Sequence, residues 1–206
     1  MTRSRLMSFV PFSAMALGLV AQTPVFADGV VGKAAPAFTL TDTTGQKRSL
    51  SDFAGKTVVL EWLNHDCPFV RKHYGSGNMQ ALQAKETAAG VVWLSVVSSS
   101  AGKEGNYPPE KLNEMTAAKS AKPTAVLLDP DGTAGRAYGA KTTPHMFVID
   151  GKGTLVYAGA IDDKSSTDPA EVKTARNYVA AALEELRAGK PVSVASTTAY
   201  GCGVKY

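Results

Sequence analysis

The chain has 206 residues, of which 44% are hydrophobic and 19% are charged, as in an ordinary globular protein. This length supports one substantial hydrophobic core and makes two independent domains unexpected. The net charge is +4, and Arg3 and Arg5 supply two of these charges, so the rest of the chain is too weakly basic to indicate nucleic-acid binding.

Residues 1–27 have the pattern of a secretory signal peptide. Arg3 and Arg5 form a positive n-region, an apolar stretch follows over 6–20, and Val25-Phe26-Ala27 provides a small-residue cleavage site. The apolar stretch is shorter than the ~20 residues that a membrane-spanning helix needs. We therefore expect cleavage near Ala27, no stable membrane span afterwards, and a periplasmic or secreted location.

The remaining chain alternates between strand and helix patterns. Short β-branched apolar runs predict strands, and apolar residues spaced three and four apart predict helices. The first half predicts a hairpin (37–42 and 47–50), a helical turn (51–56), a strand (57–63), a helix from 68 that breaks at 75–77 and restarts with Ser76 or Asn78 as its cap, and a strand (91–97). The second half predicts a helix from 108, a strand (124–128), a short helix (133–138), a hairpin (145–150 and 155–160) and a helix from 169 to near 189 with Asp168 and Glu171 as its capping box. This order predicts an α/β fold with a central mixed sheet flanked by helices.

The expected organisation is a signal peptide over 1–27, one domain over 28–189 and a C-terminal tail over 190–206. Glycines flank Cys202 in the tail, and Tyr200 and Tyr206 lie on either side of it. Because this composition is unusual for a frayed terminus, we expect the tail to pack back on the domain. The alternative is a disordered tail with an incidental cysteine.

The stretch from Thr57 to Tyr74 contains the residues best suited to chemistry. An apolar strand leads into Cys67-Pro68, where the proline suits the first turn of a helix. The free N–H groups and the dipole at a helix N-terminus favour a thiolate, and His65, Arg71 and Lys72 would add positive potential. Cys67 is therefore predicted to be reactive. The alternative is an inert buried thiol or half of a structural disulfide.

These residues resemble the active-site turn of the thioredoxin-like redoxins, in the AhpC/TSA and TlpA-like branches. The resemblance rests on Trp62, Cys67-Pro68-Phe69-Val70, the segment from Gly32 to Leu40, and Thr143-Pro144. It implies a thioredoxin-like fold with an N-terminal β-hairpin, a cis Thr143-Pro144 peptide facing Cys67, and no cofactor. Val70 stands where these proteins usually carry a second cysteine. The wall of the site is expected to comprise Trp62, Asn64, His65, Pro68, Thr143 and Pro144. For Trp62 the alternative is a position in the core.

Cys202 is the only other cysteine in the chain. In an exported protein, where disulfides persist, we expect an intramolecular Cys67–Cys202 disulfide whose reduction releases the tail. The expected function is that of an exported thiol–disulfide oxidoreductase, with Cys67 as nucleophile and Cys202 as resolving cysteine. Expected partners are exported protein thiols or disulfides, or a small thiol, and the protein is expected to be a monomer.

Two other functions stay open at this point. In a thiol peroxidase, Cys67 would become a sulfenic acid that condenses with Cys202. Peroxiredoxins carry a proline and a threonine at the positions of Leu60 and Asn64. Because the motif that orients peroxide is absent, a peroxidase function is less expected than thiol–disulfide exchange. The third function is a binding module or metallochaperone with a purely structural disulfide.

The histidines and one carboxylate complete the candidates. A Cys/His metal site with His65, His73 and His145 can be imagined, but spacing fixes no coordination geometry, so no metal ligand is predicted. Glu61 is either a proton acceptor for the thiol or a solvated residue at a strand end.

Overall fold

The computed structural model describes residue 1 and residues 29–206, so the predicted signal peptide lies almost entirely outside the described residues. Within the described part of the chain, no helix combines the length and the apolar character needed to cross a membrane.

A seven-stranded sheet of order β2-β1-β5-β4-β3-β7-β8 forms the centre of the fold. Its strands are β1 (Thr39–Asp42), β2 (Lys47–Ser49), β3 (Val58–Trp62), β4 (Val92–Val97), β5 (Ala125–Leu128), β7 (His145–Ile149) and β8 (Leu155–Gly159). The central strands β3, β4 and β5 are parallel, and the pairs at the margins are antiparallel. This is the mixed sheet that the sequence predicts, and β1 with β2 is the N-terminal hairpin.

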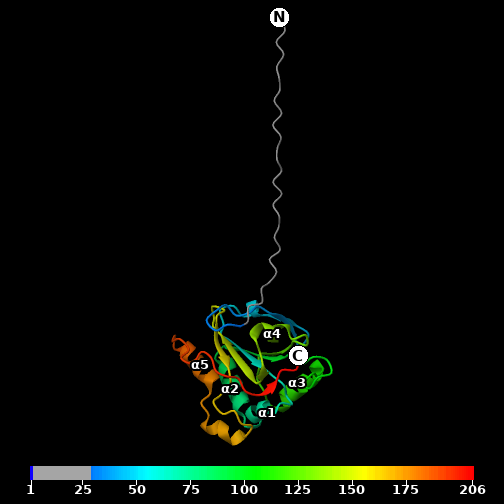
Figure 1. Ribbon diagram of the computed structural model, residues 1–206, viewed down its shortest axis with the longest axis vertical. Coiled ribbons are helices and arrows are strands. Elements are labelled where there is room, and N and C mark those ends of the chain that lie inside the picture. Colours follow the sequence, from blue (N-terminus) through cyan, green and yellow to red (C-terminus); the bar gives the residue numbers. More distant parts are fainter. Residues whose placement is uncertain (2–28) are drawn as a thin grey trace.

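Helices cover both faces of this sheet (Figure 1). They are η1 (Leu50–Phe53), α1 (Pro68–Gly75), α2 (Asn78–Ala88), α3 (Pro109–Ala118), α4 (Thr133–Tyr138), η2 (Pro169–Thr174) and α5 (Tyr178–Arg187). A second, two-stranded sheet joins β6 (Thr142–Thr143) to β9 (Cys202–Gly203). It connects the tail to the loop that precedes β7.

Two apolar clusters form because side chains alternate between the faces of each strand. Val59 and Leu63 contribute to one cluster, together with residues of α1, α2 and α5. Leu60 and Trp62 contribute to the other cluster, with α4 and the N-terminal segment. The Thr143–Pro144 peptide is cis, as the resemblance predicts. The result is a thioredoxin-like α/β fold.

The predicted long C-terminal helix is wrong in its first part. The chain forms the 3₁₀ helix η2, becomes extended, and starts α5 only after Asn177, whose side chain accepts the Ala180 N–H at 2.9 Å. The Tyr178 N–H donates to the Ile161 carbonyl at 2.9 Å, so the backbone here pairs with another segment. The predicted capping box is absent, because Glu171 accepts a hydrogen bond from a side-chain hydroxyl instead of from the Asp168 N–H.

The predicted break after α1 is present, but the predicted cap is wrong. Gly77, in a left-handed conformation with φ of 76°, is the N-cap of α2, and neither Ser76 nor Asn78 takes that position. Glycine adopts this conformation at little steric cost, so backbone geometry decides this boundary, and no capping side chain is needed.

The tail runs back across the domain after α5 (Figure 1). Its first part follows β8, where the Ala158 N–H donates to the Ala195 carbonyl at 3.1 Å and the Thr197 N–H donates to the Ala158 carbonyl at 3.2 Å. The chain then forms β9 against β6. The tail therefore passes from the edge of the main sheet to the loop that contains the cis peptide.

Candidate active site

Cys67 lies at the N-cap of α1, with Pro68 in the first turn. Asn64 builds the preceding turn: its side-chain oxygen accepts the Asp66 N–H at 2.9 Å, and its carbonyl accepts the Cys67 N–H at 3.2 Å. Its amide group donates to Glu104 at 3.0 Å. Asn64 is buried, so it acts as a fixed support for the turn rather than as an exposed wall of a site.

The Cys67 side chain is fully buried, at 0% exposure, beneath the loop that contains the cis peptide. Its Sγ donates a hydrogen bond to the Thr143 carbonyl at 2.9 Å. Thr143 is in turn paired with Cys202 across β6 and β9. The structure thus brings both cysteines, Thr143 and Pro144 to one place, at the N-terminus of α1.

Gly201 permits this close approach of the tail. Its φ is +148°, and a Cβ at this position would lie 2.1 Å from the Thr143 carbonyl oxygen. No side chain fits at that distance, so a larger residue would push β9 away from β6. The glycine before Cys202 is therefore a steric requirement for this tail position.

Both cysteines are free thiols in this structure, without the expected disulfide bond between them, and the two thiols differ in acidity. Burial raises the pKa of the Cys67 thiol, but hydrogen bonds from Cys202, the Val70 backbone and Thr143 outweigh burial, and the pKa lies below the ordinary value. Burial and the neighbouring Cys67 raise the pKa of Cys202 to about 11. Cys67 is therefore the sulfur that ionises first.

The basic residues expected to stabilise a Cys67 thiolate are occupied elsewhere, which corrects the sequence expectation. Burial, with Lys119 nearby, lowers the pKa of His65 to about 4, so its imidazole is neutral at neutral pH. Arg71 donates to the Asp66 carbonyl at 2.5 Å, and Lys72 points into a buried ion pair. Hydrogen bonds to the Cys67 sulfur, rather than nearby positive charges, therefore lower its pKa.

Of the two positions predicted for Trp62, the wall of the site and the core, the structure shows the core, on the other face of the sheet from Cys67. Its indole N–H donates to Ser98 at 2.9 Å, and its ring packs edge-on against Phe147, with 5.1 Å between centroids. Because side chains alternate along β3, the residue beside Cys67 on the chemical face is Leu63, not Trp62.

Glu61 is fully buried in the middle of the sheet, which excludes one of its two alternatives, that of a solvated residue at a strand end. Its carboxylate accepts hydrogen bonds from four side chains at 2.9–3.1 Å, those of Tyr74, Gln83, Trp93 and Ser95. Burial raises the pKa of Glu61 despite these four donors. None of these hydrogen bonds involves Cys67.

The three histidines do not converge. His65 packs edge-on against Tyr74, His145 stacks on Phe147 with 4.4 Å between centroids, and the His73 Nε2 lies 3.1 Å from the Tyr200 hydroxyl. Over residues 29–206 no group of three or more His, Cys, Asp or Glu side chains is placed to hold a metal ion.

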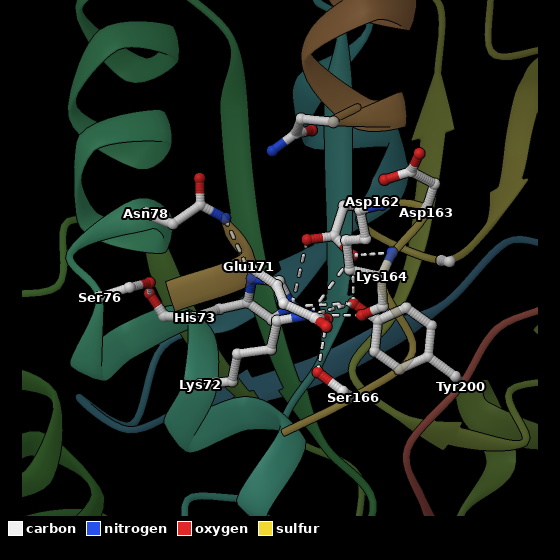
Figure 2. Close-up of polar contacts among 12 residues, drawn as sticks. Lys72, His73, Ser76, Asn78, Asp162, Asp163, Lys164, Ser166, Glu171 and Tyr200 are labelled. Atoms are coloured by element: carbon white, nitrogen blue, oxygen red, sulfur yellow. Dashed lines mark hydrogen bonds and ion pairs between the residues drawn. The ribbon is translucent and has the colours of Figure 1, made fainter. Parts of the chain in front are cut away.

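A buried polar cluster beside the site was not predicted from the sequence (Figure 2). Lys72 and His73 of α1 converge with Asp162 and with Tyr200 of the tail. Lys72, His73 and Asp162 are each no more than 2% exposed. The tyrosines of the tail were the only feature of the sequence that pointed to this cluster. Lys72 and Asp162 are far apart in the chain, so no local pattern predicts that they pair.

Comparisons with known proteins agree with this fold. The chain is similar to an uncharacterised conserved protein of Geobacillus kaustophilus, at 25% identity and a TM-score of 0.72, over 86% of this chain and 93% of that one. A hypothetical protein of Sinorhizobium meliloti shares the fold at 23% identity and a TM-score of 0.70, over 86% and 94% of the two chains.

A third structure is that of a candidate thiol:disulfide interchange protein, DsbE, of Chlorobium tepidum. It is 29% identical with a TM-score of 0.51, over 63% of this chain and 84% of that one. A search of curated proteins gives no significant match. The model of the AhpC/TSA family matches residues 31–158, which is more than half of the chain. This protein belongs to the AhpC/TSA family.

Proposed function

We propose that this protein is a thiol–disulfide oxidoreductase in which Cys67 is the nucleophile and Cys202 is the resolving cysteine. The observation that carries the proposal is the pairing of Cys202 with Thr143, whose carbonyl accepts the hydrogen bond of the Cys67 thiol. The similarity to the candidate interchange protein of Chlorobium tepidum supports the same chemistry.

In the proposed reaction, the Cys67 thiolate attacks one sulfur of a partner disulfide. A bond forms between Cys67 and that sulfur, and the other partner sulfur leaves as a thiolate that takes up a proton. Cys202 then loses its proton and attacks the Cys67 sulfur, which forms the Cys67–Cys202 disulfide and releases the second partner thiol. The partner gains two electrons and the protein loses two.

The burial of Cys67 sets a condition on this reaction. A partner disulfide cannot reach a sulfur that has no exposed surface, so β9 must separate from β6 before the first attack. Cys202 and Gly203 pair with Thr143 and Thr142, and the Val204 N–H adds one bond to the Lys141 carbonyl at 3.1 Å, so this short ladder can open without disturbing the main sheet. The proposed function therefore includes a local opening of the tail.

The experiment uses the reduced protein and oxidised glutathione as the probe disulfide. The wild type should form the internal disulfide and release two reduced glutathione molecules per chain. Cys202→Ala should stop at a mixed disulfide on Cys67, and Cys67→Ala should leave the probe almost unreacted. Equal reactivity of the two single variants would contradict the assigned roles.

A second arm separates this function from peroxidase action. Family membership makes a peroxidase the competing candidate, and hydrogen peroxide should oxidise the reduced wild type more slowly than the disulfide probe at equal concentration. Faster oxidation by peroxide, with a sulfenic acid trapped on Cys67 in Cys202→Ala, would replace the proposal. A Cys67–Cys202 disulfide that reduced glutathione does not reduce would favour a structural role.

We also propose that the protein is exported, that residues 1–27 are removed, and that the mature monomer acts on exported thiols or disulfides. The support is the charge and apolar pattern at the N-terminus. N-terminal sequencing of the protein from the exported fraction of a host should begin near Asp28. An intact Met1 in that fraction would contradict cleavage.

A further inference from the structure

The tail is fixed to the domain on both sides of Cys202 by contacts that do not involve sulfur. Beyond the cysteine, the Tyr206 hydroxyl donates to the Ala140 carbonyl at 2.8 Å, and its ring lies 4.5 Å from the Arg136 guanidinium carbon. A Cβ at Gly135 would lie 2.4 Å from the Tyr206 hydroxyl oxygen, so this ring sits directly on α4. Tyr206 is thus one anchor of the tail.

The second anchor lies two residues before Cys202. The Tyr200 ring packs against Phe69 with 5.8 Å between centroids, and the Lys72 ammonium lies 5.3 Å from its centroid. Its hydroxyl donates to the Asp162 carboxylate at 2.5 Å (Figure 2). Two residues of extended chain reach about 7 Å, so fixing Tyr200 closely limits where Cys202 can go.

The hydrogen-bond directions around Tyr200 form one consistent chain. The Asn78 amide faces the His73 Nδ1 at 3.0 Å, which makes Nδ1 the acceptor and places the imidazole proton on Nε2. The His73 Nε2 then donates to the Tyr200 hydroxyl at 3.1 Å, and that hydroxyl donates to Asp162. The Tyr200 hydroxyl is therefore both acceptor and donor.

The Asp162 carboxylate also carries the charge balance of this cluster. Its Oδ1 lies 3.7 Å from the Lys72 Nζ and accepts the Lys164 N–H at 3.0 Å. Lys72 donates to the Lys164 carbonyl and lies 3.5 Å from the Tyr200 hydroxyl. The Asp162 Oδ2 has no hydrogen-bond partner among residues 29–206, so the donors that do reach this buried carboxylate are hard to replace.

We propose that Tyr200 is a positioning residue that keeps Cys202 beside Cys67 when no bond joins the two sulfurs. This inference rests on the proposed function. It revises the expectation that reduction releases the tail: the tail stays anchored at Tyr200 and Tyr206, and only the β9 segment between them opens. The resolving thiol is thus kept at a high effective concentration, so that mixed disulfides are short-lived.

The test is the equilibrium of the full-length protein with reduced and oxidised glutathione, which measures the effective concentration of the two thiols. Tyr200→Phe keeps the ring and removes only the hydroxyl. Because a hydrogen bond to a charged group is lost, the effective concentration should fall on the order of tenfold, and the mixed disulfide should last correspondingly longer. An equilibrium equal to that of the wild type would overturn the proposal.

Tyr178→Phe is the matched control, because the Tyr178 hydroxyl makes no hydrogen bond within the part of the chain that the structure describes. It should leave the glutathione equilibrium unchanged. An equal fall in Tyr178→Phe and Tyr200→Phe would show that any lost tyrosine hydroxyl has this effect and would refute a specific role for Tyr200. Far-ultraviolet circular dichroism confirms that each variant is folded before its equilibrium is compared.

A second measurement does not depend on the redox reaction. In Cys67→Ser/Cys202→Ser, the Val204 N–H should be protected from hydrogen exchange by the Lys141 carbonyl, which it reaches at 3.1 Å. Adding Tyr200→Phe should reduce this protection about tenfold, by the same hydrogen-bond argument. A Val204 amide that exchanges freely without Tyr200→Phe would refute the anchor. A wild type that never forms the internal disulfide, with this amide protected, would refute only the proposed function.

Discussion

Two buried carboxylates, those of Glu61 and Asp162, contact side chains of α1, and their surroundings differ in charge. Glu61 in β3 accepts hydrogen bonds from four neutral side chains, and burial raises its pKa. Asp162 after β8 faces the charged Lys72 at 3.7 Å and accepts the Tyr200 hydroxyl. The carboxyl group of Glu61 thus has no counter-charge in the sheet, whereas Asp162 is paired with Lys72 and anchors the tail through Tyr200.

Consecutive residues of α1 serve both carboxylates. Lys72 and His73 face Asp162, and Tyr74 donates to Glu61 at 2.9 Å. A short helix that begins at the candidate nucleophile is thereby tied to the core of the sheet and to the tail at once. A change at either carboxylate should therefore affect the position of Cys67 as well as stability.

The largest expected effect comes from removing the paired charge. Asp162→Asn leaves the Lys72 ammonium buried without its counter-ion, which should reduce the free energy of unfolding by about 3–5 kcal/mol. Urea unfolding at pH 7 measures it. Asp163→Asn changes the exposed neighbouring carboxylate and should cost much less. Equal losses in the two variants would show that the Lys72 pair does not matter to stability.

The histidine in the Asp162 cluster should make the protein sensitive to acid. Burial lowers the pKa of His73 from 6.5 to about 4, against the attraction of Asp162. The unfolded chain therefore binds more protons between pH 6.5 and 4, so stability falls as the pH falls through this range, by up to about 3 kcal/mol for this residue. His73→Gln should flatten that slope in urea titrations. An unchanged slope would contradict a neutral buried His73.

The Glu61 side of the comparison has the opposite pH dependence. Its folded-state pKa is raised above 4.5, so the folded protein holds the proton more tightly, and stability falls as the pH rises from 4.5. Glu61→Gln is always neutral, although its amide faces groups that also donate, and should cost about 1–3 kcal/mol at low pH. The cost should shrink as the pH rises. A cost that grows with pH would mean that Glu61 is held as a carboxylate.

The smallest change concerns the acidity of Cys67. The Cys202 side chain lowers the pKa of Cys67 against the opposing effect of burial, so Cys202→Ala should move the pKa upward, whereas Cys202→Ser keeps a hydroxyl donor and should move it less. Rates of alkylation by iodoacetamide across pH give this pKa directly. Identical profiles in the two variants would assign the lowered pKa to the helix N-terminus instead.

The sequence predicted the features that depend on neighbouring residues. Pro68 after Cys67 placed the start of α1, and the turns between short apolar runs placed the β1–β2 and β7–β8 hairpins. These predictions succeeded because proline, glycine and strand periodicity act over a few residues. The same local reasoning failed for the start of α5, where the Tyr178 N–H bonds to the distant Ile161 carbonyl.

Only the tertiary structure decided the chemistry around Cys67. No local pattern predicts that Lys72 turns away from the thiol toward Asp162, or that the neutral His65 adds no charge. The sequence also did not predict that Trp62 lies on the face of the sheet opposite to Cys67. Burial and ion pairing depend on which distant segments the fold brings together, and the energy of a charge depends on that surrounding more than on its place in the chain.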